Sequence, residues 1–362
     1  MNQEPVLEKE LKQFSLFIFF CLLVWCSISY FVNKESTQGV FSAVRLLISS
    51  CFIYYFRLKI NRNVLCKIII YLAALNGFFI LIQVLEQTTN LYSLPVYMKY
   101  GGLWGYDSSV DYEPFRKGGL IRSSQVSSLL SLFSLILIIR FKSHYKLLPL
   151  VVSGIVFGPR LVMIFSLLYV MYLVFVTVVS LFKGDVKVFL SRTLIFLIFL
   201  LLLSFYLNQY DIAIVHLNRM LEAIDVVMKM DAGSNYSSSE TMKFYRFPLD
   251  VKELVFGNGH NRFHALGGND VFYTRWYLQS GFPSLILILF AIIILFFLEV
   301  KTSASLGVVT LLMLIHSFKD EVLTSFIFFD FYLAYIFSLS KTNVIKGQQN
   351  GLLSNYSNIE SK

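Results

Sequence analysis

The chain has 362 residues, of which 56% are hydrophobic and only 15% are charged, and its mean hydropathy is +0.67. Soluble domains usually carry about 25% charged residues, so this composition excludes an ordinary soluble protein and indicates a polytopic membrane protein. The net charge of +9 does not indicate nucleic-acid binding, because membrane proteins concentrate Lys and Arg in their cytoplasmic loops. The four cysteines lie in or beside apolar runs, which argues against a disulfide framework and against a thiolate metal site.

Ten apolar runs follow one another along the chain, and most approach the roughly 20 residues that cross about 30 Å of hydrocarbon. The fifth run, LLPLVVSGIVFG, is too short to cross as a straight helix, so we expect a broken hairpin with the sixth at Gly158-Pro159. The sequence therefore predicts an all-α transmembrane domain over 1–340 and a polar cytoplasmic tail over 341–362. The ten expected helices are 14–32, 39–56, 66–85, 125–141, 147–158, 160–182, 189–207, 282–300, 304–317 and 322–340.

Positive charge orients these helices. The connections on one side are rich in Lys and Arg, whereas the short connections on the other side hold only Lys34, Arg160 and Lys319. By the positive-inside rule the basic side is cytoplasmic, and both termini are expected there. Two large loops, about 86–124 and 208–281, are then expected to face outward.

The outward-facing side gathers arginines that are candidates for binding a diphosphate. Guanidinium groups bind phosphate in a bidentate way and stay charged. Arg160 is the most distinctive, since it follows a Gly-Pro break at the membrane boundary, where a charge is costly unless it has a partner. Arginines that snorkel to lipid phosphate, or that are solvated or paired with Asp and Glu, are the alternative. The candidates are Arg116, Arg122, Arg160, Arg219, Arg246 and Arg275.

The segment LVFGNGHNRFHALGGNDVFYTRWYLQSGF, residues 254–282, concentrates polar residues beside a membrane-length apolar run. On a helix, His260 and His264 would share one face, as in zinc sites of the H-E-x-x-H type, but the glutamate is missing and the glycines favour a loop. A general base is the favoured role, because an unperturbed histidine pKa of about 6.5 suits proton removal from a sugar hydroxyl. Asp270 is a further candidate, and a histidine that only hydrogen-bonds the loop remains open.

Two charged residues lie inside apolar runs. Asp330, in the tenth run, is costly unless it is paired or faces a polar cavity, and it is the residue on which a transporter would depend. Arg45 lies near the outer third of the second run, where no other feature of the sequence supports a role for it.

Four motifs follow one another over roughly residues 60–340. They are FRKGGLIRSSQVSSLLSLFSL (115–135), SGIVFGPRLVMIFSLLYV (153–170), the segment LVFGNGHN…NDVFYTRWYLQSGFPSLIL, and SFKDEVL (317–323). In this order they resemble the O-antigen/polysaccharide polymerase (Wzy) family, within the Wzy and O-antigen ligase superfamily. Pro159 stands where that family usually has a serine before its arginine. The ligase branch usually has His-Asn where this chain has Asn269-Asp270, which favours a polymerase.

The resemblance implies a GT-C-like glycosyltransferase of the bacterial cytoplasmic (inner) membrane, with its active site facing the periplasm. Such an enzyme moves a growing glycan from undecaprenyl pyrophosphate to the non-reducing end of a lipid-linked repeat unit, and it needs no metal or other cofactor. Its expected partners are these lipid-linked oligosaccharides and the bilayer; a chain-length regulator is a further candidate, and nucleic acid is not expected. The arginines would clamp the diphosphate, while Asp270, His260 or His264 would handle the acceptor hydroxyl.

Two other functions stay open at this stage. An O-antigen ligase would use the same donor and pass the finished glycan to lipid A-core. A flippase or other transporter of lipid-linked oligosaccharides would place its essential charges near the middle of the membrane, often in inverted-repeat halves. The few charges within the apolar runs favour the enzyme over the transporter.

Overall fold

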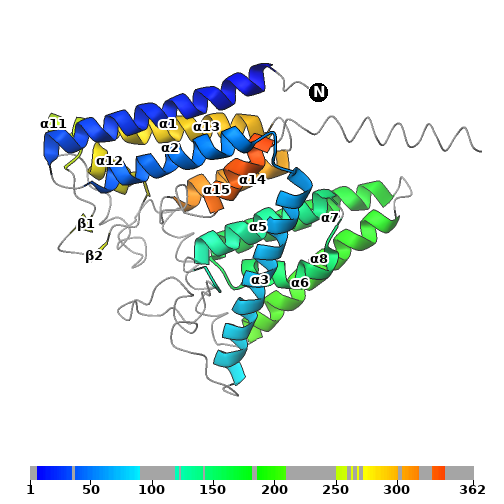
Figure 1. Ribbon diagram of the computed structural model, residues 1–362. Helices are drawn as coiled ribbons and strands as arrows, with labels where there is room; N and C mark the ends of the chain where they lie inside the picture. The colour runs from blue at the N-terminus through cyan, green and yellow to red at the C-terminus, as the bar shows by residue number, and fades with distance from the viewer. Residues whose placement is uncertain are drawn as a thin grey trace, which may run out of the picture. The chain divides into compact units, whose positions relative to one another are not determined.

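The computed structural model describes residues 6–34, 37–89, 119–121, 124–141, 143–181, 186–208, 250–258, 262–263, 267–268, 272–300, 304–317 and 328–338. These residues are helical apart from turns and one antiparallel ladder of two-residue strands, β1 (Arg262–Phe263) and β2 (Gly267–Gly268) (Figure 1). The prediction of a helical protein is therefore confirmed for this part of the chain.

Each of the ten predicted runs coincides with a helix in the structure. Three of these helices, α1, α2 and α3, are long and apolar enough to cross a membrane, and several shorter helices are also apolar. Ten membrane crossings, their orientation and the GT-C-like fold stay predictions. The helices are α1 (Val6–Asn33), α2 (Gln38–Phe56), α3 (Arg62–Thr89), α5 (Ser124–Phe141), α6 (Leu148–Val156) after the 3-10 turn η1 (Tyr145–Leu147), α7 (Arg160–Leu181), α8 (Val186–Asn208), α13 (Phe282–Val300), α14 (Ala304–His316) and α15 (Phe328–Phe337).

The predicted break at Gly158-Pro159 is present. Helix α6 ends at Val156, and α7 begins at Arg160. The N–H groups of Phe157 and Gly158 close the last turn of α6 on carbonyls behind them, at 3.0 and 3.2 Å. Pro159 cannot donate a backbone hydrogen bond, so the helix stops before it and a new one starts after it.

Two short helices that were not predicted lie in the expected outer loop 208–281: α11 (Val251–Phe256) and α12 (Phe272–Ser280). Both are too short to display a clear helical period, and α12 mixes polar with aromatic residues. They form because they pack on α13 and on each other.

The chain divides into two compact units. Unit 1 comprises Met1–Cys66, Phe247–Val308 and Phe329–Lys362, and unit 2 comprises Lys67–Arg246 and Val309–Phe328. In unit 1, α1 lies along α2 and α13 (Figure 1) and buries Phe19 and Leu22 completely. Other aromatic side chains of α1 point away from this core, with Phe17 58% and Phe31 72% exposed, which suits contact with lipid.

Two cations hold the end of α15 in unit 1. Lys12 of α1 is only 1% exposed, and its Nζ donates to the backbone carbonyl of Phe337 at 3.0 Å. Arg62 donates to the hydroxyl of Tyr335, and its guanidinium carbon lies 4.8 Å from the centroid of that ring. Cations suit this position, because the last carbonyls of a helix lack helical partners and form the negative end of its dipole. The first described helix is thereby joined to the last.

Unit 2 is built on close contacts between small residues. A Cβ on Gly77 of α3 would overlap the carbonyl oxygen of Leu150, and a Cβ on Gly154 of α6 would overlap the hydroxyl of Ser131. Serine side chains bind backbone across the same contacts: Ser128 donates to the carbonyl of Gly154 at 2.8 Å, and Ser153 to that of Gly77 at 3.1 Å. Small residues of this kind drive helix association in membranes, where apolar packing alone does not favour protein over lipid.

Candidate functional site

Most of the predicted site residues lie outside the part of the chain that the structure describes. Of the proposed diphosphate ligands, the side chain of Arg275 and the backbone of Arg160 are described. Arg116, Arg122, Arg219, Arg246, His260, His264 and Asp270 are not. The described residues around them therefore define the candidate site.

Arg160 is the first residue of α7. The carbonyl of Pro159, just before it, accepts the N–H of Met163 at 3.2 Å and so begins the helix. The first N–H groups of a helix have no helical partners and favour an anion nearby. The expected placement of Arg160 at the start of a helix is thus confirmed.

Arg275, within the predicted outer connection 208–281, lies on the short helix α12 and is partly buried. Its neighbours Thr274 and Trp276 are each 1% exposed. Such a short helix holds an arginine in a more defined position than a flexible loop would.

The Gly257 turn, residues 256–258, is the Phe-Gly-Asn part of the segment LVFGNGHN. Helix α11 begins at Val251, after the N-cap residue Asp250, whose carboxylate accepts the N–H of Glu253 at 2.7 Å. It ends at Phe256, and the next residue, Gly257, has φ +71° and donates its N–H to the carbonyl of Glu253 at 2.8 Å. Glycine suits this left-handed position, and a Cβ there would lie 2.5 Å from the carbonyl oxygen of Leu278.

Asn258 ties this turn to both short helices. Its N–H donates to the carbonyl of Leu278 in α12 at 2.9 Å, and its Nδ2 donates to Oε1 of Glu253 in α11 at 3.1 Å. Glu253 is only 7% exposed, and a buried carboxylate requires such hydrogen-bond donors. The chain therefore leaves α11 in a fixed direction.

Helix α1 holds the same turn from the other side. The Ser29 hydroxyl donates to the carbonyl of Phe256, and Asn33 Nδ2 donates to the carbonyls of Phe256 and Gly257 at 2.9 and 3.0 Å. Trp25 stacks on Phe256, with 5.6 Å between ring centroids, and its Nε1 donates to the carbonyl of Ser280 at 2.9 Å. The candidate site thus begins on the last turns of a membrane-length helix.

These three residues of α1 were missed by the sequence analysis. Trp25, Ser29 and Asn33 are spaced four residues apart, so they share one face of the helix. A polar stripe at the end of an apolar run was therefore the signal that could have found them.

The segment between the two short helices includes the strand pair β1–β2, in which Arg262 pairs with Gly268 and Phe263 with Gly267. Arg262 and Phe263 stand between His260 and His264 in the chain. These two residues form a strand rather than a helix, whereas His260 and His264 themselves lie outside the described residues.

The charged residues of the second and tenth apolar runs interact with each other. The carboxylate of Asp330 exerts an attractive Coulombic interaction on the guanidinium of Arg45, within unit 1. Asp330 Oδ1 is buried and has no hydrogen-bond partner among the described residues. Arg45 and Asp330, which lie in separate apolar runs of the sequence, thus belong to the same unit.

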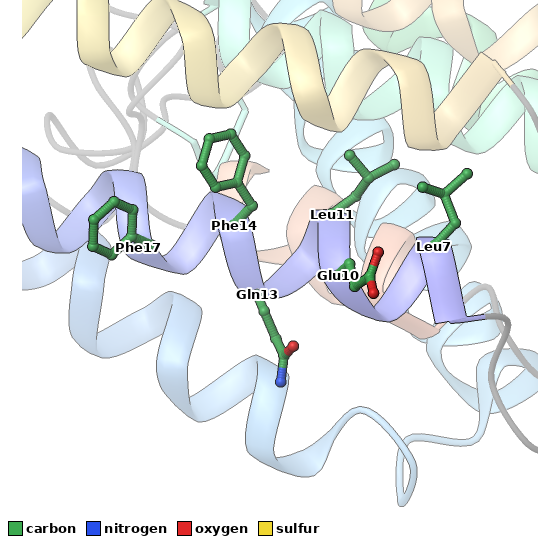
Figure 2. Close-up of a pocket in the computed structure, with 6 residues that line it drawn as sticks. All are labelled: Leu7, Glu10, Leu11, Gln13, Phe14 and Phe17. Atoms are coloured by element: carbon green, nitrogen blue, oxygen red, sulfur yellow. The ribbon is translucent and has the colours of Figure 1, made fainter.

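A hollow of about 490 Å³ lies along the first turns of α1 (Figure 2). In the figure, Leu7, Leu11 and Phe14 point toward the neighbouring helix, and Phe14 meets Phe290 of α13 edge to face at 6.1 Å. The lining residues all come from α1, and none of the predicted site residues is among them. We interpret the hollow as part of the apolar outer surface of unit 1.

No model of a protein family, no curated protein and no solved structure matches the chain. The resemblance to the polymerase family therefore stays a prediction from the sequence motifs.

Proposed function

We propose that this chain is a glycosyltransferase of the bacterial cytoplasmic membrane that polymerises a surface polysaccharide. It would move a growing glycan from undecaprenyl pyrophosphate to the non-reducing end of a lipid-linked repeat unit. The observation that carries this proposal is the binding of the Gly257 turn to the end of α1 by Trp25, Ser29 and Asn33.

A lipid-linked substrate sets the requirement that this arrangement meets. Its polyprenyl chains stay in the hydrocarbon, so the reacting head groups lie at the surface of the bilayer. The polar segment 254–282 starts and ends on elements that pack against apolar helices, rather than in a separate soluble domain. Holding two head groups next to a fixed polar segment supplies the proximity on which glycosyl transfer depends.

In the proposed reaction, the bond between the anomeric carbon and the diphosphate oxygen breaks. A new bond forms from that carbon to an acceptor hydroxyl, whose proton passes to a base. The negative charge that develops on the diphosphate is stabilised by arginines, of which Arg160, Arg246 and Arg219 are the leading candidates. Asp270, His260 or His264 accepts the proton. Arg116, Arg122 and Arg275 are further diphosphate ligands.

The test is the surface glycan profile of a strain lacking the gene, complemented with single variants. Arg160→Ala is expected to abolish the ladder of long chains while the protein still accumulates, and Arg246→Ala and Asp270→Ala to weaken it strongly. Arg192→Ala, near the start of α8 on the predicted cytoplasmic side, is the matched control and should leave the ladder intact. A normal ladder from Arg160→Ala would remove its role as a diphosphate ligand.

The same strain separates the polymerase from an O-antigen ligase. Loss of a polymerase leaves single repeat units attached to lipid A-core. Loss of a ligase leaves long polymer on undecaprenyl pyrophosphate. The departure at Asn269-Asp270 from the ligase pattern favours the first outcome.

The interaction of Arg45 with Asp330 favours a second candidate, a flippase or other transporter of lipid-linked oligosaccharides. Charges within apolar helices often line transport pathways. Loss of a flippase would leave neither polymer nor single repeat units on lipid A-core. This glycan profile would replace the polymerase proposal with the transporter.

A further inference from the structure

The Gly119 turn, residues 119–121 of unit 2, is bound to α3 by two amide side chains. Asn76 Oδ1 accepts the N–H groups of Leu120 and Ile121, at 2.8 and 3.1 Å. Gln83 Oε1 accepts the N–H of Gly119 at 3.2 Å, and Gln83 Nε2 lies 3.5 Å from the carbonyl oxygen of Gly119. Three consecutive backbone N–H groups are therefore bound by one helix.

The two amides are set deep in the unit. Asn76 is 2% and Gln83 is 6% exposed, and they lie about two turns apart on α3, so they share a face. Asn76 Nδ2 also donates to the hydroxyl of Ser127 on α5, which fixes the orientation of its amide. Burying an amide is costly unless its hydrogen bonds are made, and the Gly119 turn supplies the donors that Asn76 needs.

Gly119 is adapted to this contact. It has φ +63°, a conformation that glycine adopts readily, and a Cβ there would lie 2.6 Å from Asn76 Oδ1. The conformation of the turn therefore depends both on the amide oxygens of α3 and on glycine at position 119.

We propose that Asn76 and Gln83 are positioning residues for the diphosphate of the lipid-linked donor, an inference that rests on the proposed function. The Gly119 turn lies within the basic stretch FRKGGLIR: Arg116 and Lys117 precede it, and Arg122 follows Ile121 directly. The part of this stretch that the structure describes, residues 119–121, is fixed by hydrogen bonds to α3.

The same hydrogen bonds determine how an anion is recognised here. Consecutive free N–H groups can bind phosphate, but those of Gly119, Leu120 and Ile121 are already bound to amide oxygens. Recognition by this stretch therefore falls to its cationic side chains. An ordinary surface connection would satisfy its N–H groups with water, so two buried amides devoted to one turn indicate a position that must be held.

The experiment combines amide hydrogen exchange with steady-state kinetics on the purified full chain in lipid nanodiscs. The donor is an undecaprenyl-pyrophosphate-linked repeat unit. Asn76→Leu removes the shared acceptor and should speed exchange at Leu120 and Ile121 by at least about tenfold, as expected for the loss of buried hydrogen bonds. It should raise KM for the donor about tenfold, because the diphosphate is already charged in the bound donor, and should lower kcat less strongly, because only part of the charge develops during the reaction.

Conservative variants and a control separate positioning from general damage. Asn76→Asp and Gln83→Glu keep an acceptor oxygen and should recover most of the exchange protection and of the KM. Gln83→Leu removes the acceptor of one N–H only, so it tests the proposal if Asn76→Leu does not fold. Ser134→Ala is the matched control: Ser134 is also buried in unit 2 and donates to the carbonyl of Leu130 at 2.8 Å, away from the turn. Ser134→Ala should change neither the exchange rate at the Gly119 turn nor KM for the donor.

Faster exchange in Asn76→Leu and Gln83→Leu with an unchanged KM would overturn the positioning role and leave the proposed function standing. Slow exchange in both leucine variants would show that the hydrogen bonds themselves are wrong. If the unaltered chain did not extend the repeat unit under any condition, the proposed function would fail, and with it the diphosphate as the positioned ligand.

Discussion

The Gly257 turn of unit 1 and the Gly119 turn of unit 2 are both bound by polar side chains of a long helix, but the side chains are donors in one case and acceptors in the other. Each contains a glycine at positive φ, and each is bound by polar side chains on a long apolar helix. On α1 those side chains are donors, and they bind backbone carbonyls. On α3 the principal atoms are acceptors, and they bind backbone N–H groups.

The difference follows from what each helix meets. Phe256 and Ser280 are the last residues of α11 and α12, and the final carbonyls of a helix have no helical partners, so α1 must offer donors. The Gly119 turn precedes α5 and is not itself helical, so its N–H groups have no partners within a helix. Side chains of α3 therefore accept these hydrogen bonds. The polarity of a buried side chain in an apolar helix thus reports which backbone groups lie beside it.

The largest expected effect concerns the glycines themselves. Gly281, which joins α12 to α13, has φ +80°, and a Cβ there would overlap the backbone carbonyl of Val255. Gly281→Ala is expected to lower the free energy of unfolding by about 3 kcal/mol, since backbone cannot move aside easily. Thermal unfolding of the detergent-solubilised protein measures this.

Gly119→Ala should cost less than Gly281→Ala, because its new Cβ would lie 2.6 and 2.7 Å from the side-chain and backbone oxygens of Asn76, whereas a Cβ at 281 would overlap the backbone of Val255 much more deeply. Gly307→Ala is the control for both, because its Cβ would meet only the side chains of Val300 and Phe296. Equal losses at 119 and 281 would show that the Gly119 turn and the junction between α12 and α13 are equally rigid.

The next prediction separates the two turns by kinetics. Asn33→Leu combined with Ser29→Ala removes the donors that bind Phe256 and Gly257. Under the proposed function this turn leads to the candidate bases, so kcat should fall about tenfold or more while KM stays within about twofold. The Asn76→Leu variant should show the reverse pattern. The same split in both variants would mean that the turns do not divide binding from chemistry.

A smaller loss of stability is expected when Arg45 or Asp330 of unit 1 is replaced. These two residues are charged, whereas the side chains that bind both turns are neutral. Asp330→Asn removes the carboxylate that attracts Arg45 and should lower stability by about 1–2 kcal/mol, the partial exposure of both residues limiting the loss. Combining it with Arg45→Gln should restore part of that loss, as a double-mutant cycle of thermal unfolding would measure. Additive losses would show that the two charges act independently.

The smallest effect is expected for Trp25→Phe. This change keeps an aromatic ring to stack on Phe256 but removes the donor to the carbonyl of Ser280. It should cost about 1 kcal/mol, the usual net value of one hydrogen bond. Trp25→Leu, which removes the stack as well, should cost more in the same thermal assay. Equal losses from both variants would assign the contact to the hydrogen bond alone.

The sequence predicted the helices well because long apolar runs and a Gly-Pro pair are strong local signals, as the break between α6 and α7 illustrates. It missed α11 and α12, since helices this short form only through packing. Asn76 and Gln83 went unnoticed because a single amide inside an apolar run has no pattern. Their importance appears only when the Gly119 turn is seen against them. Arg45 and Asp330 lie far apart in the chain, so their interaction required the structure.

The hydrogen bond from Lys12 to Phe337 has a consequence for biosynthesis. Unit 1 is assembled from three separate stretches of the chain, and the two stretches of unit 2 are synthesised between them. Lys12 and Phe337 are 325 residues apart, so at about 5–20 residues per second the ribosome needs roughly 16 to 65 s to reach the second of them. During this interval the ammonium group of Lys12 lacks the hydrogen bond to the carbonyl of Phe337. Nascent α1 and α2 must therefore rest in the bilayer, or against an insertion factor, until the last helix emerges to complete their unit.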